Sequence, residues 1–322
     1  MDGGDMETIM LGGSDLEVSR LAFGGCPMGG HGWGDVSRTA LVQAVKASLD
    51  CGLNFFDTAD TYGLGEGESV LGEALRGRRD QAVIATKFGF RVGAEGTHYD
   101  NSPAWIRTAL EGSLRRLRTD YVDLYQIHYR DGRTPLADVV EALVDLREQG
   151  KIRCLGLSNV GQRDLDDIGV VVTDFVSFQN EFSLATRDHE EDITLLMTKF
   201  GLSPLTWGSL GQGILTGKYD ASARFGPDDR RSRPVYVNFH GEKLERNLRI
   251  VAALRTVAAE VEKSVPAVAL RWILDQLPGS VAIVGIKNRL QLDSNLEVID
   301  WTLPADAREL LDDVSRTEYA TS

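Results

Sequence analysis

Eight short apolar runs, separated by longer segments with helical spacing, predict that this 322-residue chain folds as a (β/α)8 barrel. The runs are mostly continuous rather than alternating, which is typical of parallel strands buried on both faces. A barrel of this size forms a single domain, here 1–322. A doubly wound open sheet is the alternative, because periodicity does not distinguish a closed sheet from an open one.

A hairpin precedes the barrel. The segment Thr8–Ser19 reads TIMLGGSDLEVS, two short runs around a Gly-Gly-Ser-Asp turn. The eight expected strands then follow as Leu21–Cys26, Leu53–Ala59, Ala82–Lys87, Tyr121–His128, Ile152–Asn159, Phe175–Asn180, Leu202–Trp207 and Val281–Ile286.

Helices are expected between these strands and after the last one. Ser102-Pro103 is a typical helix start, and Gly150 and Gly201 are typical helix ends. The expected helices are Val36–Asp50, Pro103–Arg118, Leu136–Gln149, Asp188–Phe200, Glu242–Val261, Pro266–Leu277 and Pro304–Val314. The segment after Gly285-Ile286-Lys287 also opens a helix.

One connection, Gly208–Gly241 after the seventh strand, carries no clear periodicity. Loops of this length are usually functional. We therefore interpret it as a lid over the top of the barrel. It contains Arg224, Arg230, Arg231 and Arg233, for which a bound phosphate would supply counter-charge.

Composition excludes several classes of partner. The net charge of −13 and pI of about 4.9 make nucleic acid and anionic membranes unfavourable partners. Cys26, Cys51 and Cys154 are too scattered for a disulfide framework or a zinc site. The N-terminus MDGGDMETIM lacks the features of a signal peptide, and no apolar run is long enough to span a membrane. These observations predict a cytoplasmic protein with a small-molecule substrate and no obligate protein partner.

Polar residues follow several of the expected strands. In a barrel the carboxyl ends of the strands carry the chemistry. Asp57, Lys87 and His128 end the second, third and fourth strands, and Tyr62 follows in a loop. Alone, each has an ordinary interpretation, such as a turn former, a solvated side chain or a buried core histidine. Together they are what proton transfer requires.

This set suits protonation of a carbonyl oxygen. A lysine cation beside a tyrosine stabilises the phenolate and is expected to lower the tyrosine pKa, and an aspartate holds the lysine charged. The sequence has no G-x-S-x-G motif and no metal-binding H-E-x-x-H motif, and a reactive role for Cys26 is not favoured. The missing reagent is therefore a hydride from a nicotinamide cofactor.

The cofactor site is not of the dinucleotide-fingerprint type, because Gly211-Gln-Gly213-Ile-Leu-Thr216 fails G-x-G-x-x-G at its last position. In barrels, phosphates bind at the loops after strands seven and eight. Here Gly285, Lys287 and Arg289 follow the eighth strand. A solvated basic turn is the alternative.

Several motifs resemble the signature of the aldo-keto reductases over nearly the whole chain, from about Leu11 to Leu310. They are Phe56-Asp-Thr-Ala-Asp-Thr-Tyr-Gly63 followed by Gly65, Glu68 and Leu71-Gly72; Ala85-Thr-Lys87; Asp123-Leu-Tyr-Gln-Ile-His128; Gly150-Lys-Ile-Arg153; Gly156-Leu-Ser-Asn159; and Gln179-Asn-Glu-Phe182.

The resemblance implies a TIM barrel that binds NADPH (NADP⁺) across its mouth. It implies Tyr62 as general acid, Lys87 and Asp57 as the pair that tunes its pKa, and His128 as the residue that orients the carbonyl. The implied cofactor-binding residues are Ser158, Asn159, Gln179, Trp207, Ser209, Leu210, Lys218, Gly285, Lys287, Gln291 and Asn295. Lys287 stands where related chains often carry Arg. The 2′-phosphate would therefore contact a single ammonium charge rather than the paired N–H donors of a guanidinium.

Aromatic side chains near the top loops, Trp33, Phe90, Tyr99 and Tyr129, are candidates for an apolar substrate pocket or for packing beneath loops. The function expected is reduction of an aldehyde or ketone to an alcohol. The alternative is a redox-sensing regulatory module, like the channel β-subunits that resemble this family, but the short ends of the chain offer no arm for docking.

Overall fold

Eight parallel strands close into a barrel in the order β10-β11-β12-β3-β4-β5-β8-β9. The computed structural model describes residues 6–30, 32–34, 36–93 and 96–316. Residues 1–5, part of the N-terminal segment that lacks the features of a signal peptide, lie outside the described residues. The strands are β3 (Leu21–Gly24), β4 (Phe55–Asp57), β5 (Val83–Phe88), β8 (Val122–Ile127), β9 (Ile152–Ser158), β10 (Phe175–Glu181), β11 (Ser203–Trp207) and β12 (Val281–Gly285). The predicted (β/α)8 barrel is confirmed, and the open sheet is wrong.

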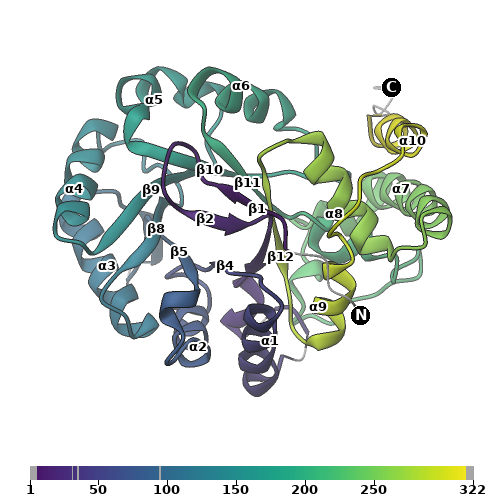
Figure 1. Cartoon of the computed structure of the whole chain (residues 1–322), viewed down its shortest axis with the longest axis horizontal. Coiled ribbons are helices and arrows are strands. Elements are labelled where there is room, and N and C mark those ends of the chain that lie inside the picture. Colours follow the sequence, from purple (N-terminus) through teal and green to yellow (C-terminus); the bar gives the residue numbers. More distant parts are fainter. Residues whose placement is uncertain (1–5, 31, 35, 94–95, 317–322) are drawn as a thin grey trace.

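The helices surround the barrel as a ring (Figure 1). They are α1 (Arg38–Asp50), α2 (Glu66–Ala74), α3 (Pro103–Leu117), α4 (Leu136–Glu148), α5 (Leu165–Val171), α6 (Glu190–Phe200), α7 (Gly241–Glu260), α8 (Val265–Gln276), α9 (Arg289–Leu296) and α10 (Ala305–Arg316). The sequence analysis did not predict α2 and α5. Both are short, and short helices are stabilised by packing rather than by their own sequence pattern.

Helix starts follow the expected chemistry. The Ser102 hydroxyl accepts a hydrogen bond from Trp105 N at 3.3 Å, and Pro103 occupies the first turn of α3. At the other end of a helix, Gly201 adopts a left-handed conformation that stops α6. These local signals hold the helix boundaries close to those expected.

The N-terminal hairpin covers one end of the barrel. Strands β1 (Thr8–Met10) and β2 (Glu17–Ser19) pair antiparallel, as predicted, and lie across the barrel opening (Figure 1). Leu11, Leu16 and Val18 are buried against inward-facing strand residues. Gly12 donates its N–H to Ser203 Oγ at 2.8 Å. Because the hairpin contacts the amino ends of the strands, the carboxyl ends remain for chemistry.

The predicted lid runs from the end of β11 to α7. It contains the short 3-10 helices η5 (Gly211–Thr216), η6 (Arg230–Ser232) and η7 (Val237–Phe239). Rings of Tyr219, Phe225 and Phe239 pack edge to face with centroids 5.0–5.5 Å apart. An aromatic cluster therefore gives this long connection a small core of its own.

A second hairpin, β6 (Phe90–Gly93) with β7 (Gly96–Tyr99), follows β5 and was not predicted. It is mostly exposed, so its sequence carries no burial pattern. The sequence feature that indicates this hairpin is the pair of glycines, Gly93 and Gly96, because glycine is common at hairpin turns.

Among the helices of the described ranges, none has the length and apolar character needed to cross a membrane.

Candidate active site

Asp57, Lys87 and Tyr62 form a hydrogen-bonded chain at the carboxyl ends of β4 and β5. Lys87 Nζ lies 2.7 Å from Asp57 Oδ1 and 3.3 Å from Tyr62 OH, and it also donates to Thr58 O at 3.0 Å. Lys87 is fully buried and Asp57 is 2% exposed. A buried ammonium needs its partners supplied by the protein, and here they are a carboxylate, a carbonyl and the phenol.

Two glutamines hold the other oxygen of Asp57. Gln179 Nε2 donates to Asp57 Oδ2 at 2.8 Å, and Gln126 Nε2 donates to the same oxygen at 3.1 Å. Gln126 was not among the residues predicted for the site. It lies within β8 rather than at the end of the strand, so a search for polar residues at strand ends does not find it.

His128 follows β8 and faces Tyr62 edge to face, with ring centroids 6.1 Å apart. Tyr129 stacks on its other side at 5.2 Å, and Phe90 lies at 5.1 Å. Burial, followed by the charge of Lys87, holds the pKa of His128 well below its usual value. The imidazole is therefore neutral at physiological pH, and one ring nitrogen carries a proton that can be donated.

The pKa of Tyr62 differs from the sequence-based expectation. Lys87 was expected to lower it, but burial, and then the charge of Asp57, raise it well above 10. The carboxylate that holds Lys87 charged also repels a phenolate. Tyr62 thus keeps its proton in the resting protein, and Lys87 Nζ lies within hydrogen-bond distance of the Tyr62 hydroxyl.

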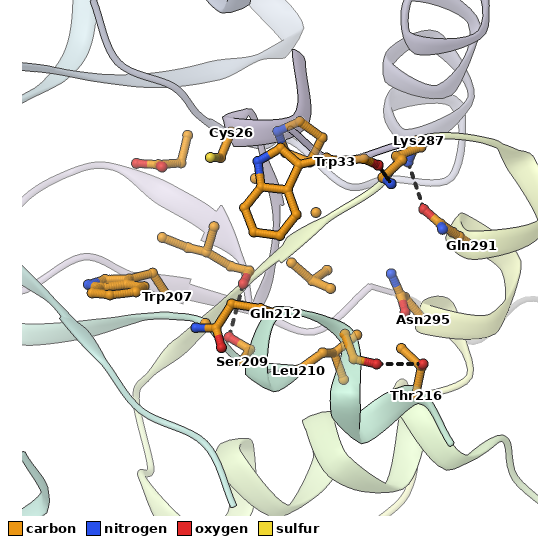
Figure 2. Close-up of a pocket in the computed structure, with 18 of the residues that line it drawn as sticks. Cys26, Trp33, Trp207, Ser209, Leu210, Gln212, Thr216, Lys287, Gln291 and Asn295 are labelled. Carbon is orange, nitrogen blue, oxygen red and sulfur yellow. Dashed lines mark hydrogen bonds between the residues drawn. The ribbon is translucent and has the colours of Figure 1, made fainter. Parts of the chain in front are cut away.

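A cavity of about 550 Å³ opens above this chain of residues. The predicted site residues line it with four exceptions. Lys87 is buried behind Asp57 and Tyr62, Phe90 and Tyr99 pack against Tyr129, and Arg289 pairs with Asp293 outside the cavity. Figure 2 shows Cys26 and Trp207 toward one end of the cavity and Lys287, Gln291 and Asn295 toward the other. The cavity is therefore elongated, with proton-transfer groups at one end and polar and cationic groups at the other.

Three amide and hydroxyl groups lie at the proton-transfer end. Asn159 Nδ2 donates to His128 O at 2.9 Å and to Ser158 Oγ at 3.1 Å. Ser158 Oγ in turn donates to Gln179 O at 2.9 Å. The amide donors of Asn159 and Gln179 are thus used within the protein. The side-chain amide oxygens, Asn159 Oδ1 and Gln179 Oε1, receive no hydrogen bond from the described residues, which leaves acceptors for a carboxamide such as that of nicotinamide.

Trp207 contributes a hydrogen-bond donor to this end of the cavity. Its indole nitrogen is buried and has no hydrogen-bond partner in the described structure. A buried donor without a partner is costly, so a ligand group is the expected partner.

Cations gather at the other end. Burial lowers the pKa of Lys287, and the charges of Arg231 and Lys218 lower it further. Arg231 is paired with Asp229, but no carboxylate of the described residues lies within ion-pair distance of Lys218 or Lys287. A phosphate would supply the missing charge, so the residues fit an NADP(H) cofactor in this orientation.

Several predicted contacts are already used within the protein. Ser209 Oγ hydrogen-bonds Thr206 O and Ile283 O, both at 2.9 Å, and so ties β11 to β12. Gln291 Oε1 accepts from Lys287 N at 2.9 Å, and Lys287 Nζ contacts Trp33 O. Lys287 and Gln291 therefore keep each other in place at the cavity wall.

Counter-charge for the lid arginines also differs from the expectation. Arg231 meets Asp229 and the Tyr219 hydroxyl within the lid itself, and Arg224 donates to backbone carbonyls. Arg231 therefore has its counter-charge within the protein and does not depend on a bound phosphate for it. Arg230, which the sequence analysis named only as part of the lid, lines the cavity.

Comparison with known proteins agrees with this geometry. Residues 20–316 match the family model described as "Aldo/keto reductase family". The aldo-keto reductase YhdN of Bacillus subtilis is 33% identical over 301 residues, covering 92% of this chain and 90% of that protein.

Two solved structures resemble the whole chain. A glycerol dehydrogenase from Gluconobacter oxydans has a TM-score of 0.87 and 34% identity, with 98% of each chain covered. An aldo/keto reductase from Klebsiella pneumoniae, in complex with NADP and acetate, has a TM-score of 0.76 and 25% identity over 98% of each chain. These similarities favour carbonyl reduction over the regulatory-module alternative.

Proposed function

The chain belongs to the aldo/keto reductase family, and from this membership we propose which residues carry its activity and which cofactor it prefers. The activity is carbonyl reduction with NADP(H). We assign it to the alcohol-forming reductases, with an aldehyde or ketone as substrate and NADPH as the preferred reductant.

Tyr62 is the general acid of the proposal. Its hydroxyl faces the cavity and hydrogen-bonds Lys87 Nζ at 3.3 Å. When the proton passes from Tyr62 to the carbonyl oxygen, the Lys87 ammonium stabilises the phenolate that remains. Asp57, held by Gln126 and Gln179, keeps Lys87 charged and fixed.

His128 orients the substrate. A neutral imidazole next to Tyr62 can donate one hydrogen bond to the same carbonyl oxygen without competing as a proton source. The aromatic rings of Phe90 and Tyr129 fix the plane of the imidazole. The carbonyl oxygen is thereby held where Tyr62 can protonate it.

The cofactor is held along the cavity. NADPH, when bound, supplies a hydride to the carbonyl carbon. Asn159 and Gln179 offer acceptors for its carboxamide, and Trp207 forms the wall beside them. Lys218 and Lys287 would neutralise the phosphates, and Lys287 with Gln291 and Asn295 forms the end suited to the adenosine 2′-phosphate.

One observation carries the proposal: the chain from Asp57 through Lys87 to Tyr62 opens into the same cavity as the cations around Lys287. The test is steady-state oxidation of NADPH and of NADH with a panel of aldehydes and ketones, with the alcohol product identified by mass spectrometry. No carbonyl-dependent oxidation of either cofactor would refute the proposal.

Cofactor preference is tested at Lys287. Lys287→Met removes a charge-assisted contact to the 2′-phosphate, worth about 1.5–3 kcal/mol, so NADPH affinity should fall at least about tenfold while NADH affinity barely changes. Equal losses for the two cofactors would assign Lys287 to the shared pyrophosphate or to the support of Trp33.

We further propose that the protein acts as one domain over 1–322, in the cytoplasm, on a small-molecule carbonyl and without an obligate protein partner. The barrel uses strands from Leu21 to Gly285, so no subdivision of the described residues leaves a closed sheet. Cys26, Cys51 and Cys154 form no disulfide, which suits a reducing compartment.

A further inference from the structure

Arg230 is a lid residue whose side chain lines the cavity. It begins η6 in the lid and lines the cavity together with Tyr62 and Cys26. Its backbone N–H donates to Gly32 O at 3.0 Å, which fastens the lid to the loop that carries Cys26 and Trp33. A Cβ on Gly32 would come within 2.5 Å of Arg230 Cγ, so the arginine side chain lies directly against this glycine. Its position is therefore set by both segments.

The Arg230 side chain has no acidic partner in the described part of the chain. Its Nε–H group is buried and donates to none of these residues, and no carboxylate of theirs lies within 4.0 Å of its guanidinium. The next residue is different, because Arg231 Nε donates to Asp229 Oδ1 at 2.8 Å. An arginine keeps its charge at all physiological pH values, so a buried donor on Arg230 calls for an anion from outside the protein.

The charge of Arg230 is felt at the catalytic end of the cavity. Burial raises the pKa of the Cys26 thiol, and Arg230 is the strongest influence that opposes this rise. Burial likewise raises the pKa of Tyr62 most, and Arg230 lowers it. At the other end, the charges that act on Lys287 are those of Arg231, Lys218 and Asp229. The two adjacent arginines therefore serve different ends of the cavity.

Aromatic side chains line the same cavity as Arg230. The rings of Trp33 and Tyr236 meet edge to face at 5.9 Å, and Tyr129 lines the side next to His128. A single charged group in such walls is the usual way a pocket fixes one end of a ligand. With a net charge of −13 the protein as a whole repels anions, so an anion would be recognised locally rather than by long-range attraction.

We propose that Arg230 binds an anionic group, a carboxylate or a phosphate, carried by the carbonyl substrate. The substrates preferred are then aldehyde acids, keto acids or phosphorylated aldehydes rather than neutral carbonyl compounds. The guanidinium fork matches the oxygen pairs of both anions. This inference rests on the proposed function, since it concerns the substrate of the reaction that Tyr62 catalyses.

The test compares substrates that differ in charge and little else. Succinic semialdehyde is paired with its methyl ester, and glyceraldehyde 3-phosphate with glyceraldehyde. For each pair, the charged-to-neutral ratio of kcat/KM is measured with NADPH in the wild type, Arg230→Met, Arg230→Lys and Arg233→Met. Arg233 is an exposed lid arginine that does not line the cavity, so its variant removes the same charge from the same segment.

The wild type should prefer the charged member of at least one pair. Arg230→Met should lower that ratio about 10–100-fold, chiefly through KM, as expected for loss of a hydrogen bond to a charged group. Arg230→Lys should restore part of it, and Arg233→Met should keep it. The pair that responds identifies the anion as carboxylate or phosphate.

Other results overturn the inference. A wild type that prefers neutral members, or an Arg230→Met variant that loses charged and neutral substrates equally, would show that Arg230 recognises no substrate anion. In the second case, NADPH affinity measured by fluorescence titration tells whether Arg230 holds the cofactor instead. If the wild type reduces members of the wider aldehyde and ketone panel but no member of either pair, the inference about Arg230 fails and the proposed function stands. If the wild type reduces no carbonyl compound at all while NADPH still binds, the proposed function itself fails.

Discussion

Tyr62 is a weaker acid in this protein than in water, because burial and the nearby Asp57 carboxylate both raise its pKa. In the mechanism we propose, catalysis depends on how far Lys87, at 3.3 Å, offsets that penalty in the transition state. An acid that keeps its proton at rest but has a cation in contact is suited to a reaction that creates an alkoxide.

Tyr62→Phe keeps the ring but removes the proton, and general acid catalysis is worth about 10²–10⁴-fold, so kcat should fall by about that factor while NADPH affinity stays within a few-fold. Lys87→Met should cause a similar loss by leaving the phenolate without its cation. Single-turnover NADPH oxidation measures both variants and the double variant.

The double variant distinguishes one shared step from two independent ones. Because Tyr62 and Lys87 act in one proton transfer, their losses should not multiply. Near-wild-type turnover in Tyr62→Phe would refute the mechanism, and losses that multiply would show that Lys87 acts independently.

Asp60 provides a pH-dependent effect on stability. Burial, and then the charge of Glu68, raise its pKa to about 7 from a value of 3.8. Between these two values the unfolded chain is ionised while the folded protein keeps the carboxyl protonated. Folding is therefore favoured by this group at low pH, and that contribution is lost as the pH rises from about 4 through about 7.

Asp60→Asn should remove this dependence, because an amide keeps an acceptor for Thr61 N but does not ionise. Urea unfolding at pH 5, 6, 7 and 8 should show the wild type losing stability relative to the variant, by a few kcal/mol at most. A constant difference across this range would mean that Asp60 ionises normally in the folded state.

Sequence analysis singled out Asp57, Lys87 and His128 because they end strands, and Tyr62 because it belongs to the same specific motif as Asp57; the structure brings these four side chains together. The sequence analysis did not reach Gln126 and Arg230. Gln126 lies within a strand, where a polar residue reads as one buried side chain among others. Arg230 lies in a loop without periodicity, and only the fold of the lid brings it beside Tyr62. The position of a loop residue depends on the path of the loop, and the spacing of residues in the sequence does not predict that path.

At the scale of elements, some cations in and near the lid are paired within the protein, and others have no acidic partner among the described residues. Asp229 supplies the counter-charge of Arg231, and the guanidinium of Arg231 lies 4.5 Å from the Phe225 ring centroid. Lys218 and Lys287 at the nearby cavity wall have no such acid in the described structure. The strands and long helices were predictable because their patterns are local, whereas the inner core of the lid joins residues far apart in a loop.

The lid should therefore become more protected when NADPH binds, since phosphates bind the cations that line it. Limited trypsin digestion should cut after Arg224 and Arg230 more slowly with saturating NADPH, while cleavage after the exposed Arg163 stays the same. Asp229→Ala should increase lid cleavage without cofactor. Equal cleavage of the lid with and without NADPH would contradict the prediction.

At the scale of the molecule, the two ends of the barrel have separate tasks. The carboxyl ends of the strands carry Asp57, Lys87 and the cavity, and the amino ends are closed by the hairpin of β1 and β2. In barrels of this kind stability and chemistry are commonly divided in this way. A change at the hairpin should therefore alter stability and leave the chemistry intact.

A substitution at Gly12 tests whether the hairpin end of the barrel affects stability alone. Its φ of +52° is a conformation that side chains rarely adopt, and a Cβ there would meet Val176 O at 2.5 Å. Gly12→Val should thus lower the free energy of unfolding by about 1–3 kcal/mol. The neighbouring Gly13→Ala should cost less, because nothing lies within 4 Å of its Cβ position. Urea unfolding gives the stabilities, and kcat at a temperature where both variants are folded should match the wild type. A loss of kcat in folded Gly12→Val would show that the closed end of the barrel controls the geometry around Tyr62 and Lys87.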